Sequence, residues 1–148
     1  MKMFSIEHNN PGFNIGELIA LYDGCGWNAD GFRNEKRTEL ALRNSLWYCS
    51  AYLAEDDRLV GFARLVGDGV YVTQLVDLMV SAPYRNRGLA RQIVSEISTG
   101  FNQQQRNAAI MLVDGSGISD LYTSLGFLDA TSEQVYYQVA AQTADASV

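Results

Sequence analysis

Two kinds of apolar pattern divide the first third of the chain. Apolar and polar residues alternate over residues 3–7, which predicts a short strand, and the Asn-Asn-Pro-Gly run at 9–12 predicts a turn. From Asn14 the apolar positions recur at helical spacing, so a helix capped by Asn14 is expected to end at the glycine-containing residues 24–26. A second helix is predicted over residues 34–44.

The middle of the chain has the pattern of a β-meander. Residues 47–54 and 59–66 are rich in aromatic and aliphatic side chains, and the polar residues 55–58 between them form a connection short enough for a hairpin. A Gly-Asp-Gly turn at 67–69 then leads into a third apolar stretch, 70–80. The pattern therefore predicts three consecutive antiparallel strands.

The period changes to that of a helix in the last part of the chain, where one apolar stripe runs over residues 89–101. A short apolar strand is predicted over 109–113, a short helix over 118–125 and a closing strand over 135–139. The final residues, 140–148, are small and polar and are expected to be disordered.

The order of these elements predicts one mixed α/β domain. A strand, two helices, three strands, a helix, a strand, a helix and a last strand make a mixed sheet with helices on both faces, an α+β arrangement. The chain of 148 residues and 16.4 kDa has the size of one domain, which we assign to residues 1–139, with 140–148 as a tail. Because 47% of the residues are hydrophobic and 19% are charged, a packed core is expected.

The acidic charge balance limits the classes of partner. Seventeen Asp and Glu against eleven Lys and Arg give a formal net charge of -6 and a pI near 4.6, the wrong sign for neutralising phosphates over a wide face. Nucleic acid is therefore not expected as a partner. The amino terminus lacks the apolar core and cleavage site of a signal peptide, and no run approaches the length of a membrane span, so a cytoplasmic location without a membrane partner is predicted.

The few cysteines and histidines argue against metal and thiol chemistry. Cys25 and Cys49 lie 24 positions apart, and His8 is the only histidine, so the sequence has no zinc-binding pattern. His8 stands in a turn-like stretch where nothing brings it to a serine, which disfavours a His-dependent triad. A disulfide between the two cysteines is one option, but their apolar neighbours favour reduced, buried thiols.

The most informative chemistry lies in residues 75–91. An apolar strand passes through a proline turn into a basic, glycine-containing loop and then a helix. A helix start exposes unpaired N–H groups at the positive end of its dipole, and Gly88 allows close approach to the backbone. Arg85, Arg87 and Arg91 add positive charge. These features favour an anion site; the alternative is a solvated helix start whose arginines pair with nearby acids.

Two short motifs, in order along the chain, carry a resemblance to a known family. Residues 85–90 read Arg-Asn-Arg-Gly-Leu-Ala, and residues 121–127 read Leu-Tyr-Thr-Ser-Leu-Gly-Phe. They resemble the R/Q-x-x-G-x-G/A signature and the aromatic-Tyr-x-x-x-Gly-Phe element of the GNAT superfamily of acetyl-coenzyme A dependent N-acetyltransferases. With the predicted elements, the resemblance extends over residues 4–139. One departure is Gly115, where many members carry an asparagine that contacts the cofactor arm.

The resemblance implies a GNAT-like fold and a cofactor site. The sheet would be mostly antiparallel, with its fourth and fifth strands splayed apart between residues 76–80 and 110–113. The pyrophosphate of the co-substrate acetyl-coenzyme A would rest on the backbone amides of residues 87–90, and its pantetheine arm would run beside residues 78–80, with no metal. The implied cofactor-binding residues are Leu78, Met79, Val80, Arg85, Asn86, Arg87, Gly88, Leu89, Ala90 and Arg91.

The chemistry that the resemblance implies is direct attack of a neutral amine on the thioester, with the coenzyme A thiolate as leaving group. An alkyl amine with a pKa of about 10 is mostly protonated at neutral pH, so a base must take a proton. Asp77 is the candidate base, because it shares a strand face with Leu75 and Met79, and apolar neighbours raise the pKa of a carboxyl group. The alternative is a structural acid that bonds the backbone or an arginine. Tyr122, which matches the family tyrosine, is the candidate catalytic proton donor to the thiolate; the alternative is a core aromatic.

The motifs leave the acceptor open. The predicted function is N-acetyl transfer to a primary amine of a small molecule; the alternatives are a non-catalytic domain that binds acyl-coenzyme A, and acetylation of a peptide or protein amine. Asp23, Asp30 and Asp68 lie in predicted turns, where they either attract a cationic amine or are solvated loop charges. Apolar strand edges near Tyr136 and Tyr137 favour a homodimer.

Overall fold

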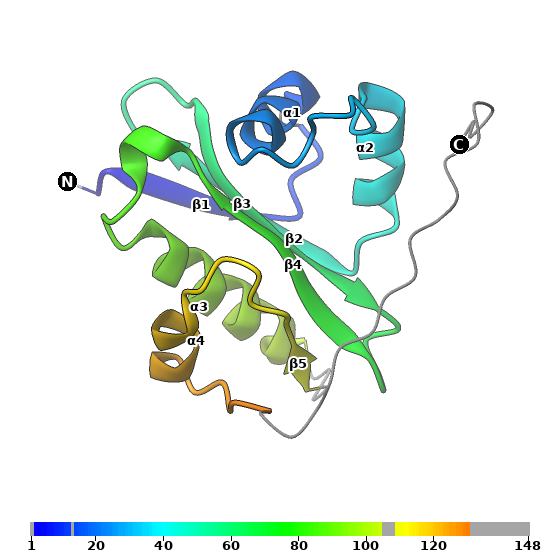
Figure 1. Ribbon diagram of the computed structural model, residues 1–148, viewed down its shortest axis with the longest axis vertical. Coiled ribbons are helices and arrows are strands. Elements are labelled where there is room, and N and C mark those ends of the chain that lie inside the picture. Colours follow the sequence, from blue (N-terminus) through cyan, green and yellow to red (C-terminus); the bar gives the residue numbers. More distant parts are fainter. Residues whose placement is uncertain (1, 13, 105–108, 131–148) are drawn as a thin grey trace. The chain divides into compact units, whose positions relative to one another are not determined.

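The helices and strands follow the predicted order (Figure 1). The computed structural model describes residues 2–12, 14–104 and 109–130. Its elements are β1 (Phe4–His8), α1 (Ile15–Gly24), α2 (Glu35–Arg43), β2 (Trp47–Leu53), β3 (Leu59–Gly67), β4 (Thr73–Val80), the 3-10 helix η1 (Ala82–Tyr84), α3 (Leu89–Gln103), β5 (Ile110–Met111) and α4 (Ser119–Ser124). The strand predicted over 135–139 and the tail predicted over 140–148 lie outside the described residues.

Asparagine side chains set where the first two helices begin. Asn14 accepts the backbone N–H of Gly16 at the start of α1, and Asn34 accepts the backbone N–H of Arg37 at the start of α2. Each bond satisfies one of the N–H groups that a helix start leaves unpaired, which contributes about 0.5–2 kcal/mol. The predicted cap at Asn14 is therefore confirmed.

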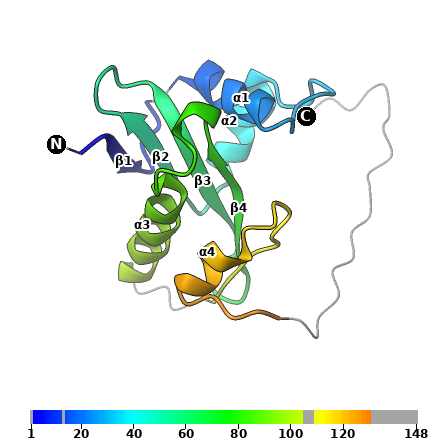
Figure 2. The same ribbon diagram turned by 60° about the vertical axis from the view of Figure 1, so that its left-hand side comes forward.

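A single five-stranded sheet organises the elements up to β5. The strands lie in the order β1-β2-β3-β4-β5; the first four are antiparallel neighbours, and β5 pairs with β4 in parallel. Helices α1 and α2 cover one face of the sheet and α3 covers the other (Figure 2). A mixed, mostly antiparallel sheet with helices on both faces confirms the predicted fold class.

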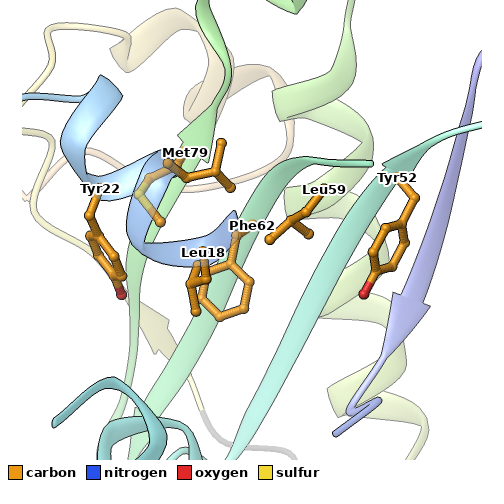
Figure 3. Packing of buried hydrophobic residues seen from close by; sticks show 7 residues of the cluster. Leu18, Tyr22, Tyr52, Leu59, Phe62 and Met79 are labelled. Atoms are coloured by element: carbon orange, nitrogen blue, oxygen red, sulfur yellow. The ribbon is translucent and has the colours of Figure 1, made fainter. Parts of the chain in front are cut away.

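Apolar side chains fill both faces of this sheet. On the side of α1, Tyr22 packs with Phe62 and Met79 in one buried cluster (Figure 3). On the other side, α3 approaches β3 at Gly61, where a Cβ would lie 2.7 Å from the side chain of Ile93, so the close packing requires a glycine. Each fully buried large apolar side chain contributes about 1.5–3 kcal/mol. Packing on both faces of the sheet therefore stabilises the positions of β3 and β4.

The described residues belong to two compact units. The first runs to Val113 and contains the sheet with α1, α2 and α3, and the second begins at Asp114 and contains α4. The assignment of one domain to residues 1–139 stays a prediction, and the dimer edge predicted near Tyr136 and Tyr137 lies outside the described residues. In the part of the chain that the structure describes, no helix has the length and apolar character needed to cross a membrane.

Strand β4 begins later than the apolar pattern predicts. The stretch over 70–80 suggests a strand from its first residue, but β4 starts at Thr73. The carboxylate of Asp68 explains the difference, because its Oδ1 accepts the backbone N–H groups of residues 70–72 at 2.7–2.9 Å. These N–H groups are then unavailable to a strand ladder. Asp68 is thus a structural residue of the β3–β4 hairpin.

Replacing Asp68 with alanine is expected to lower the midpoint of thermal unfolding at neutral pH. Hydrogen bonds from the backbone hold the pKa of the Asp68 carboxyl below its ordinary value of 3.8. The stabilisation is therefore complete above that value and is lost as the pH falls through the lowered pKa, so the difference between wild type and variant narrows in acid. Thermal melts followed by circular dichroism over a pH series measure this.

The control for this prediction is Glu55→Ala, which removes an exposed carboxylate from the turn between β2 and β3. It is expected to change the unfolding midpoint little at any pH. A difference between wild type and Asp68→Ala that stays the same down to the acid limit would show that the carboxylate charge does not hold the hairpin.

Candidate active site

The start of α3 presents backbone N–H groups that no side chain caps. The residue before the helix, Gly88, has φ 79° and ψ 2° and supplies no capping hydrogen bond. Asn86 is also in the left-handed region, with φ 58°, so the chain turns sharply into the helix. A Cβ built on Gly88 would meet nothing within 4 Å. Uncapped N–H groups at a helix start, next to a glycine with open space at its Cβ position, are the features that an anion site uses.

The three arginines of this loop have no acid partner within residues 2–12, 14–104 and 109–130. None of the ion pairs found among the described residues involves them. Arg85 donates from Nε to the carbonyl oxygen of Val80 at 2.9 Å, which ties the loop to the end of β4. Arg87 lies over the ring of Tyr84, with its Cζ 5.9 Å from the centroid, and Arg91 is exposed on α3. The anion site and the alternative of a solvated helix start both stay predictions, although no arginine–acid pair at this loop is found among the described residues.

Strand β4 has an open edge on the side of β5. The two strands pair only where Thr73 faces Ile110 and Gln74 faces Met111. Over residues 75–80, β4 has β3 on one side and no strand of the described part of the chain on the other. β4 and β5 thus separate after Gln74, and the family resemblance implies such a separation between residues 76–80 and 110–113. An extended ligand with amide groups can bond to such an edge as a strand would.

A β-bulge in β4 determines the direction of Asp77. The register between β3 and β4 shifts by one residue, so that Asp77 and Leu78 together face Ala63. Asp77 has φ 57°, in the left-handed region that aspartate and asparagine enter more readily than most residues. Because a bulge re-aims the side chains that it carries, simple alternation along the strand does not give the surroundings of this carboxylate.

Two side chains hold the carboxylate of Asp77. Tyr22 of α1 donates its hydroxyl proton to Asp77 Oδ2 at 2.7 Å, and Arg64 of β3 donates from Nε to the same oxygen at 2.6 Å. The Arg64 and Asp77 side chains are only 20% and 15% exposed. Burial, strengthened by the charge of Asp77, raises the pKa of Tyr22 well above its ordinary value. Burial alone would lower the pKa of Arg64, but the adjacent carboxylate outweighs it and raises the pKa, so both groups remain donors.

Tyr122 lies on α4 in the second compact unit. Its ring packs edge to face on Phe127, with centroids 5.9 Å apart, and its side chain is half-buried. Burial, and then the charge of Asp114, raise the pKa of the phenol above its ordinary value of 10.0. The hydroxyl therefore keeps its proton at neutral pH, as a proton donor must. The contact between the Tyr122 and Phe127 rings also fits the alternative, in which Tyr122 is a packed core aromatic.

A comparison with protein families decides the class of the chain. The family model described as acetyltransferase (GNAT) domain matches residues 29–142, which is most of the sequence. The chain belongs to the GNAT acetyltransferase family. It is therefore an enzyme of the GNAT acetyltransferase type, as the two motifs predict.

Relatives of this GNAT acetyltransferase carry acetyltransferase names. An uncharacterized N-acetyltransferase, ycf52, of Pyropia yezoensis is 26% identical over 81% of this chain and 68% of its own length. Serotonin N-acetyltransferase 2, chloroplastic, of Oryza sativa subsp. japonica is 25% identical over 97% of this chain and 72% of its own. A solved GNAT family acetyltransferase of Streptococcus pneumoniae has a TM-score of 0.71 at 22% identity, covering 95% of this chain and 100% of its own, which shows the shared fold. The chain spans about two thirds of the length of the curated relatives named ycf52.

Sequence reasoning did not find two residues that this GNAT acetyltransferase brings to Asp77. Arg64 gives a usable signal, since it is a single charge inside the apolar stretch 59–66, and a charge at a buried strand position needs a partner. Tyr22 gives no such signal in the sequence. Its ring belongs to the apolar stripe of α1, and this position does not reveal that its hydroxyl bonds to Asp77. Both residues come from elements that the fold, not the sequence order, places beside β4.

Other loop residues considered in the sequence are bonded within their own loops. Asp23 accepts from the side chain of Asn28 at 2.8 Å, and Asp30 accepts the backbone N–H of Phe32 at 3.0 Å, so both help to shape the connection from α1 to α2. In the second unit of the enzyme, Gly115 is exposed and has open space where a Cβ would stand. The cofactor contact that the family asparagine makes therefore has no side chain at this position.

The single histidine of the enzyme contacts one of its two cysteines, since Cys49 Sγ lies 3.3 Å from His8 Nδ1. His8 Nδ1 accepts from the indole N–H of Trp47 at 3.0 Å, and Nε2 lies 3.2 Å from Glu96, so the ring joins β1, β2 and α3. Cys49 is free but fully buried, and burial with the charge of Glu96 raises its pKa to about 12, which keeps the thiol protonated. Cys25 is free and only partly buried, contrary to expectation, because it caps the end of α1 at the rim of the core. Within residues 2–12, 14–104 and 109–130, no group of three or more His, Cys, Asp or Glu could hold a metal ion.

Proposed function

We propose that this chain transfers the acetyl group of acetyl-coenzyme A to a primary amine of a small molecule. The observation that carries the proposal is the start of α3, where uncapped N–H groups and three arginines without acid partners stand beyond an open strand edge. A helix start binds phosphate oxygens, and an open strand edge binds an extended amide. Acetyl-coenzyme A joins a pyrophosphate to an extended arm with amide groups, so the two features together fit it.

The chain's own residues would divide the binding of the cofactor among them. The N–H groups of residues 87–90 hold the pyrophosphate, with Arg85, Arg87 and Arg91 adding positive charge. The backbone at residues 78–80 bonds to the pantetheine arm. Met79 and Leu89, which are 1% and 2% exposed, support this strand and this helix start from the core. When bound, the cofactor supplies a thioester whose acetyl carbon is open to attack.

Two proton transfers accompany the reaction, and the proposal assigns them to Asp77 and Tyr122. The ammonium form of the amine first loses one proton to water, and Asp77 takes a second proton from the neutral amine as its nitrogen bonds to the acetyl carbon and the carbon–sulfur bond breaks. Tyr122 donates its phenolic proton to the departing sulfur, so that coenzyme A leaves as a thiol. Asp77 then loses its proton to water and Tyr122 regains one, which returns both groups to their starting states.

The acceptor in this proposal is a small primary amine. The relative named serotonin N-acetyltransferase 2, which matches 97% of this chain, supports a small molecule, whereas the relative named histone acetyltransferase TAP1 of Glycine max, also 25% identical, supports a protein acceptor. Acetylation of a peptide or protein amine is the competing function, while the family assignment disfavours the non-catalytic acyl-coenzyme A sensor considered from the sequence. The cytoplasmic location and the homodimer expected from the sequence stay predictions.

Acetyl-coenzyme A is expected to raise the midpoint of thermal unfolding of the wild-type chain. At about 100 times its dissociation constant a ligand adds about 2.7 kcal/mol, which for a domain of this size raises Tm by about 5–10 °C. Gly88→Asp should lose most of this shift, because it puts a negative charge where the pyrophosphate binds. Differential scanning fluorimetry with and without the cofactor measures both.

The matched control is Gly88→Asn, which adds a side chain of the same size without the charge. Asparagine and aspartate both tolerate the left-handed backbone, φ 79°, of this position, so the two variants differ in charge alone. An unchanged Tm in the wild type would overturn the proposed cofactor site. A rise in Tm without release of free thiol in the presence of small amines would overturn the proposed acceptor. Release of free thiol with peptide amines alone would change the acceptor class to a peptide or protein.

A further inference from the structure

The two oxygens of the Asp77 carboxylate have different surroundings. Tyr22 and Arg64 both donate to Oδ2, at 2.7 and 2.6 Å. None of the hydrogen bonds found among the described residues reaches Oδ1. A carboxylate oxygen without donors keeps its lone pairs for an incoming proton. Among the described residues, Asp77 therefore has one oxygen that accepts two hydrogen bonds and one that accepts none.

Packing fixes the direction from which Tyr22 reaches Asp77. The Tyr22 side chain is 4% exposed and lies in the cluster with Leu18 and Met79 on the α1 side of the sheet (Figure 3). The guanidinium of Arg33 covers its ring, with Cζ 4.8 Å from the centroid. The phenol therefore has little freedom to turn, and its hydroxyl is directed at Oδ2 by the core.

A second chain of contacts fixes Arg64. Its Nη1 donates to the hydroxyl of Ser45 at 3.4 Å, and that hydroxyl donates to the carbonyl oxygen of Ala41 in α2 at 2.8 Å. Its Nε meets Asp77 at the other end of the same planar group. Because the guanidinium is rigid, contacts at both ends determine its plane. Arg64 thus links α2, β3 and β4 through one side chain.

We propose that Tyr22 and Arg64 are positioning residues for acetyl transfer, which hold Asp77 by Oδ2 and thereby direct Oδ1 at the acceptor amine. The inference rests on the proposed function, in which Asp77 is the base. The left-handed backbone of Asp77, φ 57°, is costly for a residue with a side chain and persists where its surroundings hold it. The two donors supply that support at the bulge, where the direction of the side chain is set.

Three variants test the positioning. Tyr22→Phe removes one donor and keeps the ring, Arg64→Lys keeps the charge but loses the planar group, and Arg64→Met loses both. We expect kcat to fall about 10- to 100-fold for Tyr22→Phe and Arg64→Met, since a small misplacement of a reacting group costs that much. Arg64→Lys should retain more activity than Arg64→Met. The KM for acetyl-coenzyme A should stay unchanged, because neither residue belongs to the cofactor loop.

Two surface variants are the controls for these changes. Tyr71→Phe removes a hydroxyl from a side chain that is 90% exposed in the β3–β4 hairpin. Arg43→Met removes an arginine whose ion pair with Glu39 lies on the surface of α2. Both should keep the kcat of the wild type. A variant whose circular dichroism shows a lost fold is set aside, and Tyr22→Phe, the smallest change, then decides.

A double-mutant cycle with Asp77→Asn separates positioning from a general structural effect. If Tyr22 acts through the base, Tyr22→Phe has little further effect on kcat once Asp77 is asparagine. An equal loss of kcat in both backgrounds would overturn the proposal, and so would a full kcat for Tyr22→Phe in the wild-type background. If Asp77→Asn alone keeps full activity, the assigned base is wrong, which is a different result from a positioning failure.

Discussion

Exchanging Asp77 for asparagine is expected to lower kcat for acetyl transfer by about 10²- to 10⁴-fold. The exchange removes the group that takes the proton and keeps the shape of the side chain. Asparagine enters the left-handed region as readily as aspartate, so the bulge at this residue, with φ 57°, is retained. Its amide oxygen can still accept from Tyr22 and Arg64. Release of free thiol in the presence of a small primary amine measures kcat.

The chain provides a close control for this exchange. Asp57, in the turn between β2 and β3, has φ 55°, so Asp57→Asn makes the same chemical change on the same backbone conformation away from the candidate site. It should leave kcat as in the wild type. Asp77→Asn should also keep the rise in Tm with acetyl-coenzyme A. Wild-type kcat in Asp77→Asn would exclude Asp77 as the base.

Tyr122→Phe is expected to reduce kcat to a similar degree while leaving the affinity for acetyl-coenzyme A nearly intact. The variant keeps the ring that packs on Phe127 and loses the proton that the departing sulfur takes up. Because the pKa of Tyr122 lies above its ordinary value of 10.0, the phenol is a donor throughout the neutral range. On the alkaline side of the pH profile, kcat of the wild type should therefore fall only in strong base, and this alkaline fall should be absent from the residual activity of the variant.

Cofactor affinity in the same variant distinguishes the two roles of Tyr122. The measurement is isothermal titration with acetyl-coenzyme A, with Tyr71→Phe as the control for losing a hydroxyl. If Tyr122→Phe loses affinity and turnover together, the tyrosine is a structural residue of the second unit. Unchanged kcat with unchanged affinity would assign the proton transfer to water.

The elements that the sequence predicts well are those whose burial leaves a regular pattern. The stripe of α3 faces the core on one side, so its residue types follow the 3.6 spacing, whereas β2 and β3 are buried on both faces and therefore appear as continuous apolar stretches. The start of β4 could not be predicted in the same way. There a single carboxylate, Asp68, withdraws three backbone N–H groups from the ladder, although the residues that carry them are apolar.

The candidate site likewise has a part that the sequence predicts and a part that it does not. The loop over residues 85–91 could be predicted because its charge, its glycine and the helix start are contiguous in sequence. The partners of Asp77 could not, since Tyr22 and Arg64 stand 55 and 13 positions away and meet it only through the fold. The bulge adds a second obstacle, because a shift of one residue in register changes which side chains a strand residue meets.

The edge of β4 over residues 75–80, which pairs with no strand among the described residues, also bears on contacts with other protein chains. A row of unpaired backbone groups is a template for strand addition, and hence for aggregation. In this protein the same bulge that carries Asp77 interrupts the regular spacing of those groups within residues 75–80. A long strand of another protein chain cannot stay in register with β4 across the bulge at Asp77. A short ligand arm beside residues 78–80 needs no register across the bulge. The irregularity that directs a carboxylate thus also protects the free edge against self-association.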